Sequence, residues 1–192
     1  MGSPRKIRKK YSPPSHPWQR ERINQEKTLN KTYSFKNKKE IWKMVSTLKD
    51  FTSQAKTLNA RIGPQAELEA EQLVARLQRL GLVKENATLD TVLDLQVENI
   101  LERRLQSIVY RKGLAHTMKQ ARQFIVHGHI AVKGIPITRP SHLVTIDEEQ
   151  GITFLMTSAL ADPEHPERSL KPQQPAAPVE SPKAEATPEA TA

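Results

Sequence analysis

The fold of this chain is indicated most clearly by one stretch of its sequence, TMKQARQFIVHGHIAVKG, residues 117–134. Thr117 and Gln120 form a capping-box pattern that predicts the start of a helix, and Gly128 predicts its end. After Gly128 the apolar residues alternate instead of recurring at helical spacing. This alternation predicts a hairpin over residues 130–137, with Gly134 supplying the positive φ that a tight turn needs.

The flanking segments extend this pattern in both directions. Apolar residues at helical spacing predict one helix over residues 97–112, and apolar runs at 143–146 and 152–154 predict two further strands. Pro136 cannot donate a hydrogen bond, so its side of the hairpin should be a sheet edge. Residues 97–165 therefore predict an α+β module in which two helices pack on a short, mainly antiparallel sheet.

The region before this module is expected to be helical. Asn37 followed by Glu40 resembles a capping box, and Pro64 suits a first helical position. Apolar stripes and capping residues predict helices over residues 19–29, 37–58, 64–80 and 88–93.

Charge is distributed unevenly along the 192 residues. The chain has 30 Lys and Arg against 21 Asp and Glu, a formal net charge of +9, and most of the excess lies in residues 1–43. Such an excess favours polyanionic partners, of which nucleic acid is one. Residues 166–192 are instead acidic and rich in Pro and Ala, and they have too few large apolar residues to fold. We therefore expect a basic arm, a folded body and a disordered tail.

Several classes of protein are excluded or disfavoured by composition. The chain has no Cys, which excludes disulfides and thiolate-based sites and suits a cytosolic protein. No apolar run approaches the length of about 18 residues that predicts a membrane span. The basic first residues are not followed by an apolar stretch, so no secretory signal is expected.

Polar residues of the helix predicted from Met118 suggest what the module binds. Lys119, Arg122 and Gln123 are three or four residues apart and should share a face, and Lys133 lies at the predicted turn. A basic helix face, a helix N-terminus and a basic turn can together hold a phosphate backbone. We expect them to form a single electropositive surface, although an ordinary solvated helix face would give the same pattern.

The same residues resemble the RNA-binding domain named after small-subunit ribosomal protein S-four. Its signature resembles Ala121-Arg122, Phe124-Ile125, Gly128, Ile130, Val132 and Gly134. Two other segments are similar to the archaeal type of that protein family: residues 101–106 resemble the domain's opening helix, and residues 4–18 resemble a basic opening. The resemblance covers about residues 4–165, whereas the domain by itself also occurs in RNA-modifying enzymes.

The resemblance implies a division of the chain and a role in the ribosome. The division is a basic arm at 1–36, a helical rRNA-binding region at 37–96, the S-four-type domain at 97–165 and the tail at 166–192. A member of this family would be a cytoplasmic constituent of the small ribosomal subunit that binds small-subunit rRNA, nucleates assembly and supports translational accuracy. It would contact ribosomal protein S-five, other small-subunit proteins and mRNA near the entry channel of the ribosome. It would need no cofactor.

The candidate rRNA-binding residues lie in the arm and in the module. They are Arg5, Lys6, Arg8, Lys9, Lys10, Arg103, Arg104, Arg111, Lys112, His116, Lys119, Gln120, Arg122, Gln123, His127, His129 and Lys133. We expect Arg122→Ala to weaken rRNA binding with little loss of stability, because Arg122 should lie on an outer helix face. Removing residues 166–192 should leave binding intact.

Three alternatives are weaker. An enzyme that carries this domain, such as a pseudouridine synthase or a tyrosyl-tRNA synthetase, needs a large catalytic domain, and the region before residue 97 has no phosphate loop or nucleophile–base pattern. A free-standing RNA-binding or ribosome-associated factor would lack the long basic arm. His127 and His129 have no further ligands nearby, so no metal site is expected. The turn type stays open, because Lys133 stands where many members have Asn.

Overall fold

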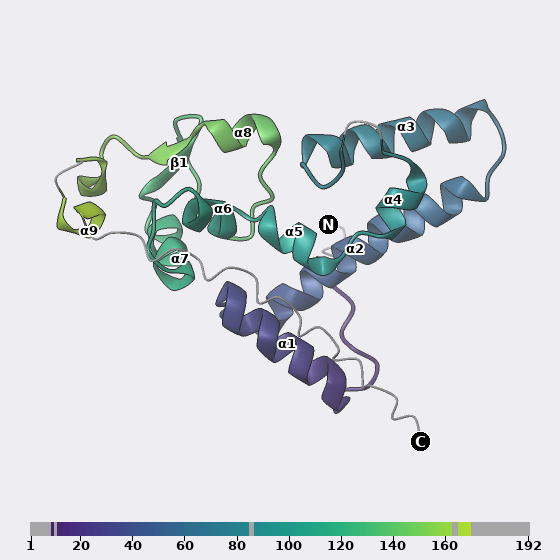
Figure 1. Ribbon diagram of the computed structural model, residues 1–192, viewed down its shortest axis with the longest axis horizontal. Helices are drawn as coiled ribbons and strands as arrows, with labels where there is room; N and C mark the ends of the chain where they lie inside the picture. Colours follow the sequence, from purple (N-terminus) through teal and green to yellow (C-terminus); the bar gives the residue numbers. More distant parts are fainter. Residues whose placement is uncertain (1–8, 10, 85–86, 163–164, 170–192) are drawn as a thin grey trace, which may run out of the picture.

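The computed structural model describes residues 9, 11–84, 87–162 and 165–169 of the chain. In chain order the elements are α1 (Arg20–Tyr33), α2 (Lys38–Asn59), α3 (Pro64–Arg79), α4 (Leu89–Leu93), α5 (Val97–Glu102), α6 (Leu105–Arg111), α7 (Met118–Val126), β1 (Ile130–Val132), β2 (Ile135–Pro136), α8 (Ile146–Gln150), β3 (Ile152–Phe154), the 3-10 turn η1 (Ala159–Ala161) and α9 (Pro166–Ser169). Figure 1 shows α2, α3 and α4 on one side of the molecule and α6, α7, α8 and β1 on the other, with α5 between them.

The N-terminal helices form the first of two hydrophobic cores. Ile41, Met44, Phe51 and Ala55 recur along one face of α2 and are buried against α3, α4 and α5. Full burial of a large apolar side chain contributes about 1.5–3 kcal/mol, so this stripe is what holds the long helix in place. The helices that we predicted in this region are confirmed, α1 being longer than expected at its C-terminal end.

The second core belongs to the C-terminal module. Ile108 of α6, Ile125 of α7 and Ile130 of β1 are fully buried in it together with Val144. Ile100 of α5 instead packs into the first core. The two cores therefore meet where α5 passes into α6.

The predicted single helix over residues 97–112 is wrong, because the chain breaks it at residues 103–104. At the break the backbone pairs with a distant segment: Leu105 N donates to His142 O at 2.8 Å, and Val144 N donates to Arg103 O at 3.0 Å. Arg104 and Leu143 form an antiparallel bridge. These bonds replace the hydrogen bonds of a continuous helix at residues 103–104. The apolar residues therefore keep helical spacing in the sequence across a point where the backbone is extended.

The predicted strand over 143–146 is also wrong, and the same pairing explains why. Leu143 forms the bridge just described, but Thr145 then caps a helix, with its side chain accepting from Glu148 N at 3.3 Å and the Glu148 carboxylate accepting from Thr145 N at 3.0 Å. This reciprocal capping box begins α8 where we expected a strand and a loop.

The predicted hairpin is confirmed. β1 is the central strand of an antiparallel sheet in the order β2-β1-β3, so Pro136 lies on an edge strand as expected. The turn residues Lys133 and Gly134 have φ values of 50° and 81°. Positive φ at both positions of a two-residue turn identifies type I′, which matches the right-handed twist of the strands.

The observed architecture is the α+β class that the sequence predicted, with a helical N-terminal region and a small three-stranded sheet. The chain forms a helical turn, α9, at the start of the segment expected to be disordered, and residues 170–192 lie outside the described part. Within that part, no helix combines the length and the apolar character needed to cross a bilayer.

Candidate nucleic-acid interface

Two of the predicted RNA-binding arginines meet inside the protein, at Glu40 near the start of α2. Arg122 of α7 donates to both oxygens of the Glu40 carboxylate, at 2.7 and 3.1 Å, and Arg104 donates to its Oε2 at 2.8 Å. Arg104 is only 1% exposed and its guanidinium lies over the ring of Phe35, 4.9 Å from the centroid. The capping-box pattern at Asn37 thus marked the helix start, but the Glu40 side chain bonds to the arginines instead of the backbone.

The charges at this junction stabilise one another. Burial would raise the pKa of the Glu40 carboxyl, but the hydrogen bonds and positive charges of Arg122 and Arg104 outweigh it and hold that pKa below its usual value. Burial lowers the pKa of Arg104, which Glu40 partly offsets. Arg104 is therefore a correction to our predicted site, because a buried guanidinium paired with a carboxylate is not available to RNA. Arg122 also points to α2, not to an outer face.

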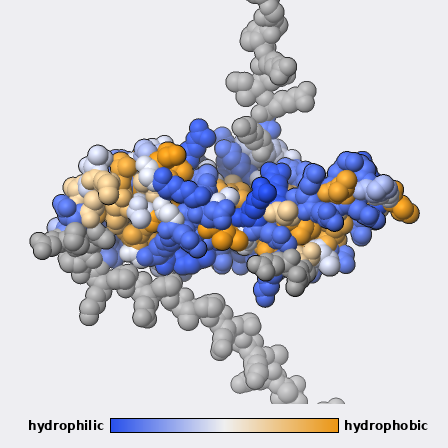
Figure 2. Space-filling model, turned by 90° about the horizontal axis from the view of Figure 1, so that it is seen from above, coloured by the Kyte–Doolittle hydropathy of each residue, from blue (hydrophilic) through white to orange (hydrophobic). Residues whose placement is uncertain are grey.

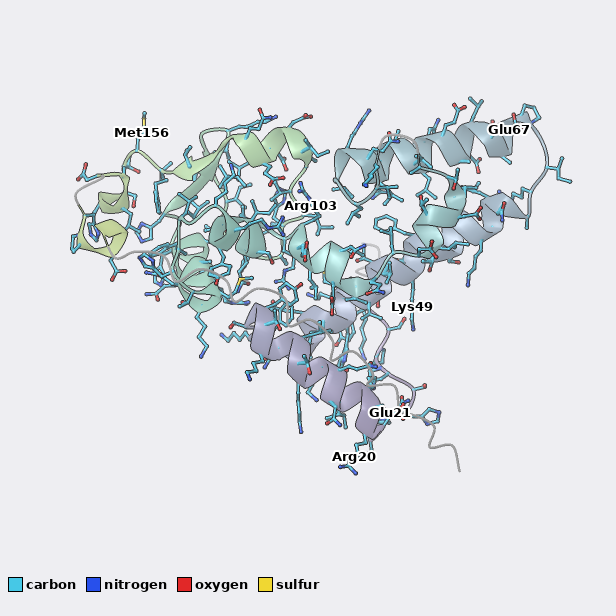
Figure 3. The ribbon with its side chains drawn as sticks, viewed as in Figure 1. Arg20, Glu21, Lys49, Glu67, Arg103 and Met156 are labelled. Atoms are coloured by element: carbon cyan, nitrogen blue, oxygen red, sulfur yellow. The ribbon has the colours of Figure 1, made fainter. Side chains whose placement is uncertain are left out.

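Arg103 is held at the centre of the molecule, between the two cores (Figure 3). Its guanidinium donates to Glu149 at 2.6 Å and to Val144 O at 3.0 Å. Gly81 has a φ of 67°, and a Cβ there would lie 3.1 Å from the Arg103 Cζ. Gly81 therefore allows the guanidinium to approach the end of α3, and Arg103 joins the two halves of the chain.

The last turn of α6 carries two more predicted residues, and both are exposed. Arg111 pairs with Glu102 at 3.3 Å, and Lys112 Nζ donates to Glu149 O. The Arg111 pair is about half exposed on both sides, and pairs of this kind contribute little to stability. The Arg111 side chain can therefore leave its pair at small cost.

The N-terminus of α7 is bonded to the start of α9. Thr117 Oγ1 accepts from Gln120 N at 3.1 Å, as the capping pattern predicted. The Gln120 side chain, however, accepts from His116 N at 2.7 Å and donates to the Glu167 carboxylate at 2.7 Å. His116 Nε2 also lies 2.7 Å from Glu167 O. Glu167 is thus bonded to His116 and Gln120, two residues that we predicted to contact RNA.

The outer face of α7 is open. Lys119 and Gln123 are exposed and share that face, and neither has a side-chain hydrogen bond or ion pair within the described residues. His127 follows at the end of the helix and is also exposed, whereas His129 Nδ1 lies 2.8 Å from Ser158 Oγ. Where the structure describes the chain, it places no group of three or more His, Asp or Glu residues where they could hold a metal ion.

Lys133 lies at the hairpin tip beside the end of α8. Its backbone N donates to Gly151 O at 2.9 Å, and a Cβ added at Gly151 would meet the Lys133 side chain. Lys112 reaches the same end of α8 through Glu149 O. In Figure 1, α8 lies on the opposite side of α6 from α7. The surface that we expected to be single is therefore two patches, one on α7 and one beside α8.

Of the predicted arm residues, Lys9 is exposed. The others, Arg5, Lys6, Arg8 and Lys10, lie outside the described residues. Their assignment to RNA stays a prediction.

Basic residues that sequence reasoning missed line a cleft between α3 and the segment that follows β2. Arg76, Arg79, Arg139 and His142 contribute to this cleft of about 520 Å3. Figure 2, which views the molecule from the side of α3 and α8, shows hydrophilic residues gathered over its middle and apolar ones toward both ends. The i, i+3 spacing of Arg76 and Arg79 was a visible signal for a shared face. No local pattern indicated that Arg139 lies opposite them.

Comparison with known proteins gives two results. Residues 103–149 match the family model of the S4 domain, the RNA-binding domain whose signature the sequence resembles. The chain is also 55% identical over 170 residues to the small ribosomal subunit protein uS4 of Methanococcus aeolicus, an alignment that covers 88% of this chain and 96% of the relative. The proteins of the same name from Methanococcus maripaludis strain C5 and Methanococcus vannielii are 51% and 49% identical with the same coverage.

Proposed function

Because the chain belongs to the family of the small ribosomal subunit protein uS4, we propose that it is a structural constituent of that subunit and binds small-subunit rRNA directly. The observation that carries this proposal is similarity over nearly the whole length of the relatives, 96% of the Methanococcus aeolicus protein, combined with an S4 domain. An enzyme that merely carries an S4 domain would match over the domain alone. The chain is accordingly a binding protein of cytoplasmic ribosomes and not an enzyme.

The described surface supports a mechanism that needs no chemical step. Exposed cations that have no side-chain partner among the described residues, such as Lys119 and Lys133, are available to neutralise phosphates. Each phosphate that they neutralise releases condensed counterions, so affinity should fall as salt rises. Folded RNA is recognised mainly through its shape, phosphates and 2′-hydroxyls, and a rigid protein with two cores can present these cations in fixed positions. The product of binding is a stabilised RNA fold.

Finer parts of the proposal follow from the family resemblance alone. They are binding at a multi-helix junction in the 5′ domain of the rRNA, nucleation of subunit assembly, support of translational accuracy, and contacts with ribosomal protein S-five and with mRNA where it enters. The basic arm would become ordered as it neutralises additional backbone.

The test has two parts. First, small subunits purified at high salt should contain the chain in a one-to-one ratio with other small-subunit proteins, measured by quantitative mass spectrometry. Recovery in substoichiometric amounts, or only from dissociated ribosomes, would instead indicate a ribosome-associated factor. Second, the purified chain should protect a discrete region of small-subunit rRNA from hydroxyl-radical cleavage, and diffuse protection that salt abolishes everywhere would contradict specific binding.

A further inference from the structure

The short helix α9 folds back onto the start of α7, and the chain just before it is anchored in the S4 domain. Leu160 of η1 is buried in the second core, and Ser158 Oγ lies 2.8 Å from His129 Nδ1. Glu167 follows Leu160 by only seven residues. So short a tether keeps Glu167 at a high effective concentration beside α7.

Glu167 satisfies two neighbouring hydrogen-bond donors at the start of α7. Gln120 Nε2 donates to the Glu167 carboxylate at 2.7 Å, and His116 Nε2 lies 2.7 Å from Glu167 O. A carbonyl oxygen can only accept, so His116 Nε2 carries the hydrogen in this contact. The Gln120 side chain is held in place, because its Oε1 accepts from His116 N at 2.7 Å. Glu167 therefore offers two acceptor oxygens to a preformed pair of donors.

An RNA backbone offers the same kind of acceptor, since its phosphate oxygens and 2′-hydroxyls accept from side-chain N–H groups. The helix dipole favours a negative group at the start of α7, and α7 has no acidic residue of its own in its first turn. Lys119, in that turn, is exposed and adds positive charge. The Glu167 carboxylate thus has the charge and the acceptors that an RNA phosphate would bring to these donors.

We propose that α9 is an autoinhibitory segment: Glu167 occupies the donors at the start of α7 in the free protein, and RNA displaces it. This inference rests on the proposed function and adds regulation to it. Both bonds of Glu167 are exposed to solvent, and neither hydrophobic core includes a residue of α9 among those described. Exposed polar contacts of this kind stabilise little, so the segment can open.

The closed segment reduces the apparent affinity for RNA in proportion to the fraction of molecules that are open. If about half of the molecules are closed, abolishing the contact raises affinity about twofold. Removing residues 166–192, which from the sequence we expected to leave binding intact, should therefore also raise affinity about twofold.

The first test separates this contact from a general effect of charge. Full-length variants are compared for binding to a small-subunit 5′-domain rRNA transcript. Glu167→Asp keeps the charge but is one methylene shorter, so it should lose the bond to Gln120 and bind about twofold more tightly. Glu167→Gln weakens the same bond by removing its charge and should also gain. Glu180→Gln, in the distal tail, is the control and should bind like the wild type. If Glu167→Asp binds like the wild type, or either Glu167 variant binds more weakly, the proposal is overturned.

The second test follows α9 directly. The chain has no Cys, so Ser169→Cys in the full-length protein gives a single position for a nitroxide spin label. In the free protein the label should broaden the methyl signal of Met118 in α7, relative to the same sample with the label reduced. The methyl signal of Met44 is the control, because Met44 is buried in α2, which Figure 1 shows on the far side of α7 from α9.

Adding the transcript should sharpen the Met118 signal again. A Met118 signal that is sharp in the free protein would show that α9 does not dock on α7. Broadening that persists in the complex would show that RNA does not displace α9. Either result overturns the proposal and leaves the proposed function in place, whereas failure of the wild-type chain to bind the transcript would reject the proposed function itself.

Discussion

The junction around Glu40 and the cleft beside α3 both contain arginines, but the arginines of the junction are paired and those of the cleft are exposed. At the junction, Arg104 and Arg122 are paired with one carboxylate and largely withdrawn from solvent. In the cleft, Arg79 and Arg139 are exposed and have no carboxylate partner among the described residues. A partner within the chain, and not residue type, therefore separates an arginine that stabilises the fold from one whose guanidinium stays exposed.

The largest effect should come from removing the shared carboxylate. Glu40→Ala leaves two guanidinium groups without a partner, one of them fully buried, so we expect a loss of about 3–5 kcal/mol in the free energy of unfolding. Urea unfolding followed by circular dichroism measures it. The matched control is Glu102→Ala, which breaks the exposed pair with Arg111 and should cost less than about 1 kcal/mol. Equal losses in the free energy of unfolding for the two variants would show that the pairs at Glu40 stabilise the fold no more than an exposed pair does.

Arg122→Ala should destabilise the protein by about 1–3 kcal/mol, because it removes two hydrogen bonds to the Glu40 carboxylate. From the sequence we expected this variant to weaken rRNA binding with little loss of stability. The structure instead predicts a loss of stability. Lys119→Ala, on the exposed face of the same helix, is the control and should leave the unfolding midpoint unchanged while weakening rRNA binding. A midpoint for Arg122→Ala that matches the wild type would show that the pair between Arg122 and Glu40 does not stabilise the fold.

The junction should also respond to pH. Because the pKa of Glu40 is lowered in the folded protein, its charged form stabilises the fold at any pH above its unfolded pKa of about 4.3. That contribution is lost as the pH falls through the lower folded pKa. The free energy of unfolding, measured from about pH 6 downward, should therefore fall less steeply in Glu40→Gln than in the wild type. Parallel curves would show that another carboxyl group controls the acid response.

A smaller effect of opposite sign is expected at the hairpin. Lys133 has a φ of 50°, a conformation that Asn tolerates better than Lys. Lys133→Asn should therefore raise the free energy of unfolding by up to about 1 kcal/mol while weakening rRNA binding a few-fold through the lost charge. Thermal unfolding and filter binding measure the two changes. A variant that becomes both less stable and tighter-binding would contradict the assigned turn and the assigned role together.

The smallest effect concerns Glu167, the acidic residue of α9 that bonds to residues at the start of α7. Glu167 accepts from Gln120 and places its carbonyl beside His116, two positions predicted to contact RNA. Glu167→Gln removes a negative charge from that surface and should raise rRNA affinity about twofold, mainly at low salt. Glu180→Gln has the same change in the distal tail and serves as the control. A decrease in affinity would mean that Glu167 positions the helix for RNA.

Much of the fold followed from local patterns. The helix from Met118, the hairpin at Gly134 and the edge position of Pro136 all depend on residues within a few positions of one another, so the sequence was enough to predict them, whereas it left the turn type open. The errors at residues 97–112 and 143–146 share one cause. The backbone at Arg104 pairs with Leu143, and no local pattern encodes a contact across that separation.

The candidate site, like the fold, could be predicted from the sequence only in part. Composition and residue spacing were enough to predict that the chain is basic, that α7 has a polar face and that the module is α+β, because these properties are fixed before any tertiary contact forms. Which cations keep an exposed, unpaired side chain among the described residues depends instead on contacts between distant segments. Arg122 and Lys119 lie on one helix three residues apart, yet Glu40 from a distant helix neutralises one and not the other. Availability depends on such long-range pairing, which a one-dimensional pattern does not contain.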